Sequence, residues 1–178
     1  MSSLKTYKLN EYRTESGAQY KNLSTTYQLF GKELHSAPIV LVNHALTGNS
    51  DVASDKKGWW KEIIGVNKLI DFNKYTVIAF NILGNGYDDL LIDNYKDFTT
   101  KDVAIIFHKA LLEIKVKNVF AIIGGSLGGG IAWEMGSLFP QFSTYIIPIA
   151  THHKANDWII AHCAVQESIL LNSRKPLQ

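Results

Sequence analysis

The chain has 178 residues, of which 46% are hydrophobic and 19% charged, and this composition is typical of a single globular domain. Its net charge of +2, without a long basic run, gives no electrostatic reason to expect nucleic acid or a membrane surface as a partner. The sequence shows neither an apolar leader nor an apolar run of membrane-spanning length, so we expect a cytoplasmic protein. The single Cys163 fits a reducing compartment and is predicted to be a buried thiol on a helix.

Two segments near the N-terminus, residues 5–12 and 24–30, alternate apolar with polar residues. Such alternation indicates strands with one face on the core and the other in water. The pair Ser16-Gly17 lies between the two segments and suits a turn. We therefore expect the fold to open with an antiparallel pair of strands.

Residues 39–42 and 75–83 are almost continuously apolar, which indicates strands buried on both faces of a parallel sheet. Between them, residues 58–69 place Trp59, Trp60 and other apolar residues at roughly helical spacing, so a helix is predicted there. The acidic residues of the next loop lack the spacing of a calcium site and are expected to be solvated. They are Asp88, Asp89, Asp93 and Asp97.

A second helix is predicted after Thr99, which can cap it together with Asp102 three residues later. Apolar residues then recur at helical spacing and form one stripe that suits packing on a sheet, while His108 is expected at the surface. A further apolar strand is predicted at residues 144–149 and an apolar helix at residues 155–171. The alternation of strands and helices predicts the α/β class, with a mostly parallel sheet and flanking helices. The stripe consists of Val103, Ile106, Phe107, Ala110, Leu111 and Ile114.

The segment that carries chemistry begins with an apolar strand at residues 119–123 and continues as Gly124-Gly125-Ser126-Leu127-Gly128, which fits the pattern Gly-x-Ser-x-Gly. A helix-compatible stretch follows and ends at Pro140. Strand, tight turn and helix form the context in which this pattern indicates a nucleophile elbow, with the serine hydroxyl at a helix N-terminus. The alternative is a plain Gly-rich turn; a phosphate loop is excluded because the Lys-Ser/Thr ending is missing. Ser126 is therefore the candidate nucleophile.

An elbow of this kind works with two backbone N–H groups that bind the oxyanion of the tetrahedral intermediate. One comes from the residue after the nucleophile, here Leu127, and the other from the loop after an earlier strand, here Leu46. His44 in that loop is expected to shape it without a catalytic role. The remaining histidines, His152, His153 and His162, match no zinc spacing and are not accompanied by a cysteine pair, so no metal is predicted.

Both loops belong to a longer ordered set of motifs that runs from about residue 38 onward. Together these motifs resemble the homoserine O-acetyltransferase branch of the α/β-hydrolase superfamily. A His-Ala-Leu-Thr-Gly loop followed by Gly-Trp-Trp is unusual among general esterases and makes the resemblance more specific than the elbow alone. The motifs are His44-Ala45-Leu46-Thr47-Gly48, Gly58-Trp59-Trp60, Ile64-Gly65, Asp71, Tyr75, Val77-Ile78, Asn81, Leu83-Gly84 and Gly124-Gly125-Ser126-Leu127-Gly128-Gly129.

The resemblance implies a ping-pong acyl transfer in methionine biosynthesis. Ser126 would attack the thioester of the co-substrate acetyl-CoA, with no bound cofactor, and the acetyl group would pass from the serine to the hydroxyl of L-homoserine. Histidine would act as base, oriented by an acidic residue. Members of the family often form dimers, so a homodimer is what the resemblance suggests for a full-length protein, while the sequence leaves the oligomeric state open. Acetyl and succinyl transferases share this framework, and the donor stays open between the two.

The sequence departs from the family where the acid and histidine should follow. Only 52 residues (178 − 126) come after Ser126, and two further strands with their crossovers do not fit into them. Asp157 and His162 lie within the predicted last helix, and Arg174 lies in a polar tail that does not match the family's substrate-binding arginine. We therefore predict one incomplete α/β-hydrolase domain over residues 1–178, truncated after about the sixth strand.

For the isolated chain we expect acetyltransferase turnover near background, a Ser126 that phosphonates do not label, and an unpaired strand at residues 144–149 that favours aggregation. Two alternatives to the transferase stay open: a serine hydrolase of the esterase or lipase type, and a non-catalytic remnant of the fold.

Overall fold

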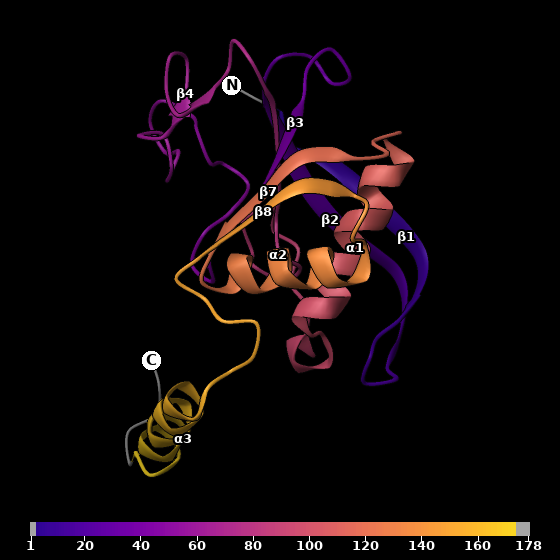
Figure 1. The fold of residues 1–178 in the computed structure, drawn as a ribbon. Helices are drawn as coiled ribbons and strands as arrows, with labels where there is room; N and C mark the ends of the chain where they lie inside the picture. The colour runs from indigo at the N-terminus through magenta and orange to yellow at the C-terminus, as the bar shows by residue number, and fades with distance from the viewer. Residues whose placement is uncertain (1–2, 174–178) are drawn as a thin grey trace.

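The computed structural model describes residues 3–173 and shows a six-stranded sheet in the order β1-β2-β6-β3-β7-β8 (Figure 1). Strand β2 pairs antiparallel with β1 and with β6, and the other neighbours are parallel. The predicted α/β class with a mostly parallel sheet is therefore confirmed. The strands are β1 (Lys5–Arg13), β2 (Gln19–Gly31), β3 (Ile39–Asn43), β6 (Thr76–Phe80), β7 (Val119–Gly125) and β8 (Ser143–Ile149).

The opening antiparallel pair and the buried strands follow the sequence pattern. β1 and β2 are joined by a turn in which the N–H of Gly17 donates to the carbonyl of Thr14 over 3.0 Å. Every residue of β3 and β6 is buried, as continuous apolar runs predict for the centre of a parallel sheet. Among residues 3–173, no helix is both long enough and apolar enough to cross a membrane.

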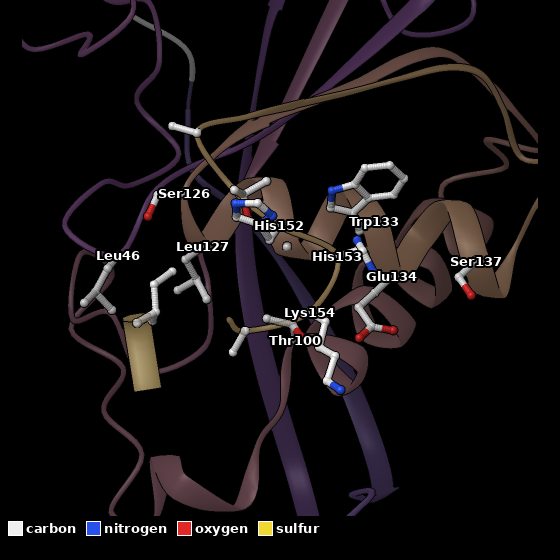
Figure 2. Close-up of a pocket in the computed structure, with 15 residues that line it drawn as sticks. Leu46, Thr100, Ser126, Leu127, Trp133, Glu134, Ser137, His152, His153 and Lys154 are labelled. Carbon is white, nitrogen blue, oxygen red and sulfur yellow. The ribbon is translucent and has the colours of Figure 1, made fainter. Parts of the chain in front are cut away.

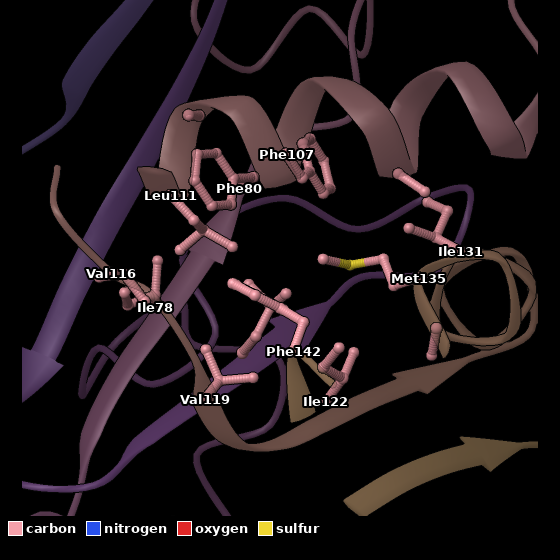
Figure 3. Close-up of a cluster of buried hydrophobic side chains, with 14 of the residues drawn as sticks. Ile78, Phe80, Phe107, Leu111, Val116, Val119, Ile122, Ile131, Met135 and Phe142 are labelled. Carbon is pink, nitrogen blue, oxygen red and sulfur yellow. The ribbon is translucent and has the colours of Figure 1, made fainter. Parts of the chain in front are cut away.

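Helices α1 (Thr100–Glu113) and α2 (Leu127–Leu138) cover one face of the sheet, and their contact with it forms the larger core (Figures 1 and 3). The predicted capping box is present, because the Thr99 side chain accepts from the Asp102 N–H and the Asp102 side chain accepts from the Thr99 N–H. Most of the predicted stripe of α1 faces this core, where Phe107 stacks on Phe80 with ring centroids 4.7 Å apart, while Ile106 packs in a separate cluster with residues of β1 and β2. His108 is half-buried, against the expectation of a surface residue, and stacks on Phe139 at 3.7 Å.

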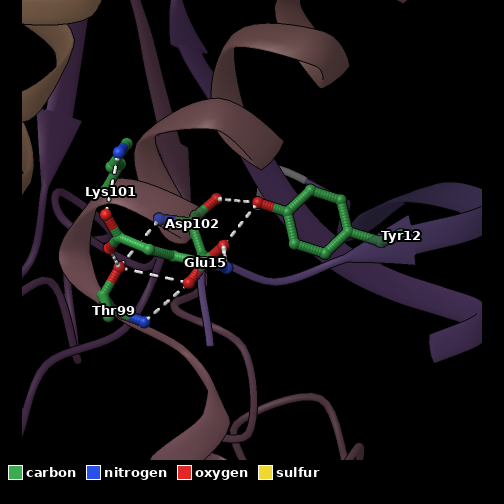
Figure 4. A network of polar contacts seen from close by, with 5 residues as sticks. All are labelled: Tyr12, Glu15, Thr99, Lys101 and Asp102. Atoms are coloured by element: carbon green, nitrogen blue, oxygen red, sulfur yellow. Dashed lines mark hydrogen bonds and ion pairs between the residues drawn. The ribbon is translucent and has the colours of Figure 1, made fainter. Parts of the chain in front are cut away.

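Asp102 does more than cap α1, since it also ties the helix to the β1–β2 hairpin (Figure 4). Its carboxylate accepts hydrogen bonds from the Tyr12 hydroxyl at 2.8 Å and from the backbone N–H of Glu15 at 2.9 Å. The Glu15 side chain pairs with Lys101 at 2.8 Å. Burial, and then the bond to Asp102, raise the pKa of Tyr12, so its hydroxyl stays a proton donor. The hairpin is thereby held to the helix that leads to the site.

The opposite face of the sheet shows where the sequence interpretation was wrong. Residues 58–69 form turns and the short strand β4 (Ile64–Gly65), which pairs with β5 (Ile70–Asp71), instead of the predicted helix. A helix here would need the N–H of Asn67 to donate to the carbonyl of Ile63, but that carbonyl accepts from Ile70 at 2.9 Å and the Asn67 N–H donates to the Asp71 side chain at 3.0 Å. The apolar residues of this segment still pack on the sheet, in one cluster with residues of β3, β6 and β7, which is why their pattern resembled a helix.

The acidic loop before α1, which includes a short 3-10 helix (Tyr95–Asp97), is only partly solvated. Asp97 accepts from the Tyr20 hydroxyl at 2.6 Å, and Asp88 accepts from the hydroxyl of Thr26. Both carboxylates therefore fasten the loop to β2, which corrects the expectation of a purely solvated loop.

The C-terminal part of the described chain is largely uncovered. β8 is the last strand of the sheet, so the predicted unpaired edge is present. Helix α3 (Asp157–Leu171) confirms the predicted helix but lies away from the sheet, with every residue exposed (Figure 1). Cys163 lies on this helix and is exposed, so the expectation of a buried thiol was wrong. Arg174 lies outside the described residues.

Candidate functional site

The turn between β7 and α2 has the backbone geometry of an elbow. Ser126 adopts φ 53° and ψ −118°, a conformation that costs a non-glycine residue free energy and persists only where neighbours fix it. Its N–H donates to the carbonyl of Ile149 at 2.9 Å, and its own carbonyl accepts from Gly129 and Gly130 at 3.0 and 3.1 Å. The side chain is exposed and caps no helix N–H. The strained turn therefore presents a free hydroxyl at the N-terminus of α2.

Glycines are required here because helix and strand backbones nearly touch. A Cβ on Gly128 would lie against the carbonyl oxygen of Asn43 and 2.6 Å from that of His44. A Cβ on Gly124 would lie against the carbonyl of Gly128. The first turn of α2 is thus pressed onto the end of β3, which brings Leu127 close to the loop that carries Leu46.

That loop, residues 44–48, is held by His44, which is 1% exposed. The backbone N–H of Ile82 donates to Nε2 of His44 at 2.9 Å, so Nε2 carries no proton. Nδ1 lies 2.6 Å from the carbonyl oxygen of Ala45 and must donate to it. One neutral imidazole therefore links the loop after β3 to the loop after β6, which agrees with the expected loop-shaping role.

A buried network of polar side chains also fixes this loop. The side chain of Asn81 accepts from the Ser50 N–H at 2.7 Å and donates to the hydroxyls of Thr26 and Ser50 at 2.7 and 3.0 Å. Ser50 in turn donates to Gln28 at 2.7 Å. The network joins β2 to the loops after β3 and β6, so hydrogen bonds anchor the loop that contains Leu46 to the sheet.

Acidification is expected to destabilise the protein through His44. Burial lowers the pKa of His44, against the opposing bond to the Ala45 carbonyl, while an unfolded histidine titrates near pH ~6.5. At a pH between the folded and the unfolded pKa, only the unfolded chain binds the proton. The contribution of His44 to the free energy of unfolding is therefore fully present above pH ~6.5 and decreases as the pH falls below that value. Burial lowers the pKa of His108 too, so this histidine also contributes to the loss of stability on acidification.

Urea unfolding at pH 7.5 and 5.5 would measure this loss, with a slope of at most about 1.4 kcal/mol per pH unit for each histidine. His44→Gln keeps an acceptor near the position of Nε2 and is the control, for which we expect a shallower slope. An unchanged slope in that variant would show that His44 does not titrate on unfolding.

Ser126, Leu46 and Leu127 line one cavity of about 870 Å³ (Figure 2). As the first residue of α2, Leu127 has an N–H without an acceptor in its own helix, and no hydrogen bond from the Leu46 N–H is found within residues 3–173. The three residues predicted from sequence are thus brought together around one space. A smaller, mostly apolar cavity of about 230 Å³ adjoins it and shares Leu46, Thr100 and Leu127 with it.

No base is positioned against the serine in the described part of the chain, where the Ser126 hydroxyl has no hydrogen-bond partner. Asp157 and His162 lie on α3, and His162 stacks on Trp158 at 6.1 Å instead of reaching the elbow. His152 and His153 do line the cavity, but His153 packs edge-on against Trp133 at 6.3 Å. Across residues 3–173, no group of three His, Cys, Asp or Glu side chains is arranged to hold a metal ion.

Several residues around the cavity were not singled out as site residues from the sequence. Trp133, Glu134 and Ser137 extend along α2, and Lys154 follows β8 (Figure 2). Their only sequence signal is position, about two to three helical turns after the elbow or just after a strand end. The polar network around Asn81 was also not predicted, although Asn81 is a polar residue directly after a strand and its position could have indicated a role near the site.

The comparisons with known proteins agree with this geometry. Residues 38–161 match the family model described as the alpha/beta hydrolase fold. The chain is 35% identical to a homoserine O-acetyltransferase of Moorella thermoacetica, over 88% of the chain and 47% of that protein. The crystal structure of homoserine O-acetyltransferase from Staphylococcus aureus superposes with a TM-score of 0.80 and 28% identity, over 97% of this chain and 54% of that one.

An acetylester hydrolase from Corynebacterium glutamicum shares the fold with a TM-score of 0.79 at 21% identity, over 96% of this chain and 50% of that one. The chain therefore spans about half the length of the relatives that it matches. The family model covers residues 38–161, which is most of the chain. The chain accordingly belongs to the alpha/beta hydrolase fold family.

Proposed function

We propose that this chain supplies the nucleophile and the oxyanion hole of an acyltransferase of the homoserine O-acetyltransferase type. The observation that supports the proposal is that the strained, exposed Ser126 lines one cavity together with Leu46 and Leu127, the two residues expected to supply oxyanion N–H groups. The similarity to homoserine O-acetyltransferases over 88% of the chain supports transfer to homoserine over other acyl chemistry.

In the proposed reaction, the Ser126 oxygen attacks the thioester carbon of acetyl-CoA and the carbonyl oxygen becomes negative. The N–H groups of Leu46 and Leu127 and the positive end of α2 stabilise that charge, and one such donor contributes about 3 kcal/mol in related enzymes. The Ser126 proton passes through the base to the sulfur as the C–S bond breaks, so CoA leaves as the thiol and acetyl-Ser126 remains. The hydroxyl of L-homoserine then attacks the ester, and its proton passes through the base to the Ser126 oxygen as the ester bond to Ser126 breaks, which releases O-acetylhomoserine and restores the serine hydroxyl.

The smaller cavity supports acetyl over succinyl as the group transferred. It lies beside both proposed oxyanion donors and is lined by neutral residues, mostly apolar ones. A succinyl carboxylate placed there would be buried without a cation, which is costly. The lining comprises Leu46, Ile82, Leu83, Gly84, Asn85, Tyr95, Phe98, Thr99, Thr100, Val103, Leu127 and Ile131.

The test joins residues 1–172 to the second half of the Moorella thermoacetica protein, so that a base is supplied to Ser126. With acetyl-CoA and L-homoserine, we expect this hybrid to form O-acetylhomoserine, detected by mass spectrometry, while the 178-residue chain alone stays near background. A hybrid that releases CoA but yields only free acetate, with or without homoserine, would favour the hydrolase alternative suggested by the esterase neighbour. A fully active isolated chain would contradict the assignment of a missing base.

A further inference from the structure

A second cavity, of about 500 Å³, lies at the end of the sheet opposite Ser126, where β3, β7 and β8 begin. Its lining includes Pro38 before β3, Asn118 before β7 and Thr144 near the start of β8. In Figure 1, β7 runs from the loop after α1 to the start of α2, so this cavity and Ser126 lie at opposite ends of that strand. Seven strand residues separate them by roughly 20 Å. A ligand in this cavity, which we call the distal cavity, is therefore not a substrate for Ser126.

The charged side chains that line the distal cavity are all basic. They are Lys115 and Lys117, joined by His35, and no Asp or Glu of the described chain contributes to the lining. Within residues 3–173, the ammonium group of neither lysine has an ion-pair or hydrogen-bond partner. Glu113, two residues before Lys115, lies towards β1, since burial and then the charge of Glu113 raise the pKa of Tyr7. The distal cavity therefore attracts a small anion.

Neutral donors in the same lining add hydrogen-bonding capacity to this charge. The backbone N–H groups of Lys117 and Asn118, the Asn118 amide and the Thr144 hydroxyl all lack an acceptor in the part of the chain that the structure describes. A phosphate monoester carries nearly two negative charges and three strong acceptor oxygens, whereas a carboxylate carries one charge on two oxygens. Two ammonium groups with several N–H and O–H donors match phosphate better, and lysine is a common phosphate ligand.

Lys115 occupies a backbone position that favours glycine. After α1, the N–H of Val116 donates to the Leu111 carbonyl and the N–H of Lys115 donates to the Leu112 carbonyl, both over 2.9 Å. This is the hydrogen-bond pattern of a Schellman motif, whose left-handed residue is usually glycine and is here Lys115, with φ 61°. A lysine in the last turn of α1 would interact with the helix dipole without this strain. The strained lysine therefore indicates a function for its side chain.

Backbone strain is concentrated at two cavities. Asn and Asp tolerate a positive φ through their short polar side chains, and apart from them and glycine four residues in the range 3–173 adopt it. Ser126 and Ala150 line the cavity that contains the proposed nucleophile, while His35 and Lys115 line the distal cavity. Histidine adopts this conformation more readily than lysine, so Lys115 is the stronger indication. Strain of this kind clusters at functional sites, and its distribution supports a second site.

We propose that the distal cavity binds a small molecule through a phosphate group, which the ammonium groups of Lys115 and Lys117 hold. Inorganic phosphate and a phosphate ester share this chemistry, and two observations favour the ester. The ring of Phe120 is 38% exposed, lines the cavity and packs on Tyr75 with ring centroids 5.5 Å apart, so it offers an apolar wall to an organic group. A volume of about 500 Å³ is in the range of pockets for small organic ligands. This site does not depend on the reaction proposed for Ser126.

Equilibrium dialysis of the 178-residue chain against adenosine 5′-monophosphate and against inorganic phosphate tests the proposal, at a constant ionic strength of about 0.1 M. We expect saturable one-to-one binding of both probes, because both carry the phosphate group. Tighter binding of the nucleotide would identify a phosphate ester as the kind of occupant, and equal affinities would identify inorganic phosphate. Both results support a phosphate site.

Lys115→Gly is the most informative variant, because it removes the ammonium group and also relieves the backbone strain. We expect it to bind the nucleotide about 10-fold more weakly, as for the loss of one charge-assisted hydrogen bond, and to melt at the same or a higher temperature. Lys117→Gln should weaken binding by a similar factor. Lys8→Gln is the matched control, since it removes the same charge from β1 at the other edge of the sheet, and it should leave the affinity within about 2-fold.

Absence of saturable binding for both probes would overturn the proposal. So would a loss in Lys8→Gln as large as that in Lys115→Gly, because binding would then reflect net charge alone. Nucleotide binding that Lys115→Gly leaves unchanged would place the ligand elsewhere, for example beside Ser126, and would also overturn it. A Lys115→Gly chain that is at least as stable but binds weakly would show that this lysine serves the ligand and not the fold.

Discussion

Replacement of Ser126 by alanine in the hybrid enzyme is expected to lower kcat for acetyl transfer by about 10⁴- to 10⁶-fold. Without the hydroxyl no acetyl-enzyme forms. The acetyl group would then have to pass directly from acetyl-CoA to homoserine, with only the oxyanion hole to stabilise the transition state. The residual rate should reflect the Leu46 and Leu127 N–H groups, which alanine leaves in place. Initial rates of CoA release and of O-acetylhomoserine formation would measure the loss.

Ser137→Ala is the matched control, since Ser137 lies on the same helix, lines the same cavity and is also exposed. We expect its rate to stay within about 3-fold of the unaltered hybrid, because surface substitutions of this kind change little. If the Ser126 variant kept a comparable rate, transfer would proceed without a serine ester and the proposed nucleophile would be wrong. Circular dichroism of both variants would separate a chemical loss from a folding loss.

The elbow could be predicted from sequence because its requirements are local. A buried strand, a turn that only small residues can make and a helix leave a readable pattern around Ser126, and the structure reproduces each of these elements. The same holds for α1, where a cap at Thr99 and a stripe of apolar residues decide both the start and the buried face. The buried strands β3 and β6 could be predicted in the same way, from their continuous apolar runs.

The segment at residues 58–69 could not be predicted because its hydrogen bonds are not local. Apolar spacing near Trp59 and Trp60 resembles a helix, but the backbone there pairs with residues 51 and 52 and with a neighbouring short strand. The network around Asn81 escaped for the same reason, since it joins residues more than thirty positions apart. The apolar composition of α3 predicted burial, but composition does not show whether other elements cover a helix, and the exposed Cys163 lies on one that the described residues leave uncovered.

Replacement of Gly128 by alanine is expected to destabilise the fold by about 2–3 kcal/mol, or roughly 5–10 °C in Tm for a domain of this size. The backbone of Gly128 does not need a left-handed conformation; what it needs is space. The added Cβ would meet two backbone carbonyls, those of Asn43 and His44, and neither can rotate away as a side chain would. Relief requires α2 to move off the end of β3.

Such a shift would carry Leu127 away from the loop of Leu46, so the variant should lose acetyl transfer in the hybrid even at a temperature where it remains folded. Gly130→Ala, two residues along the same helix, is the control. Its Cβ would meet only Thr100 Cγ2 at 3.6 Å, an ordinary contact. Because alanine favours a helix over glycine by up to ~1 kcal/mol, this variant should be slightly more stable. Opposite signs for the two glycines in thermal unfolding would show that the close approach of α2 to β3 holds the two halves of the oxyanion hole together, and equal effects would contradict it.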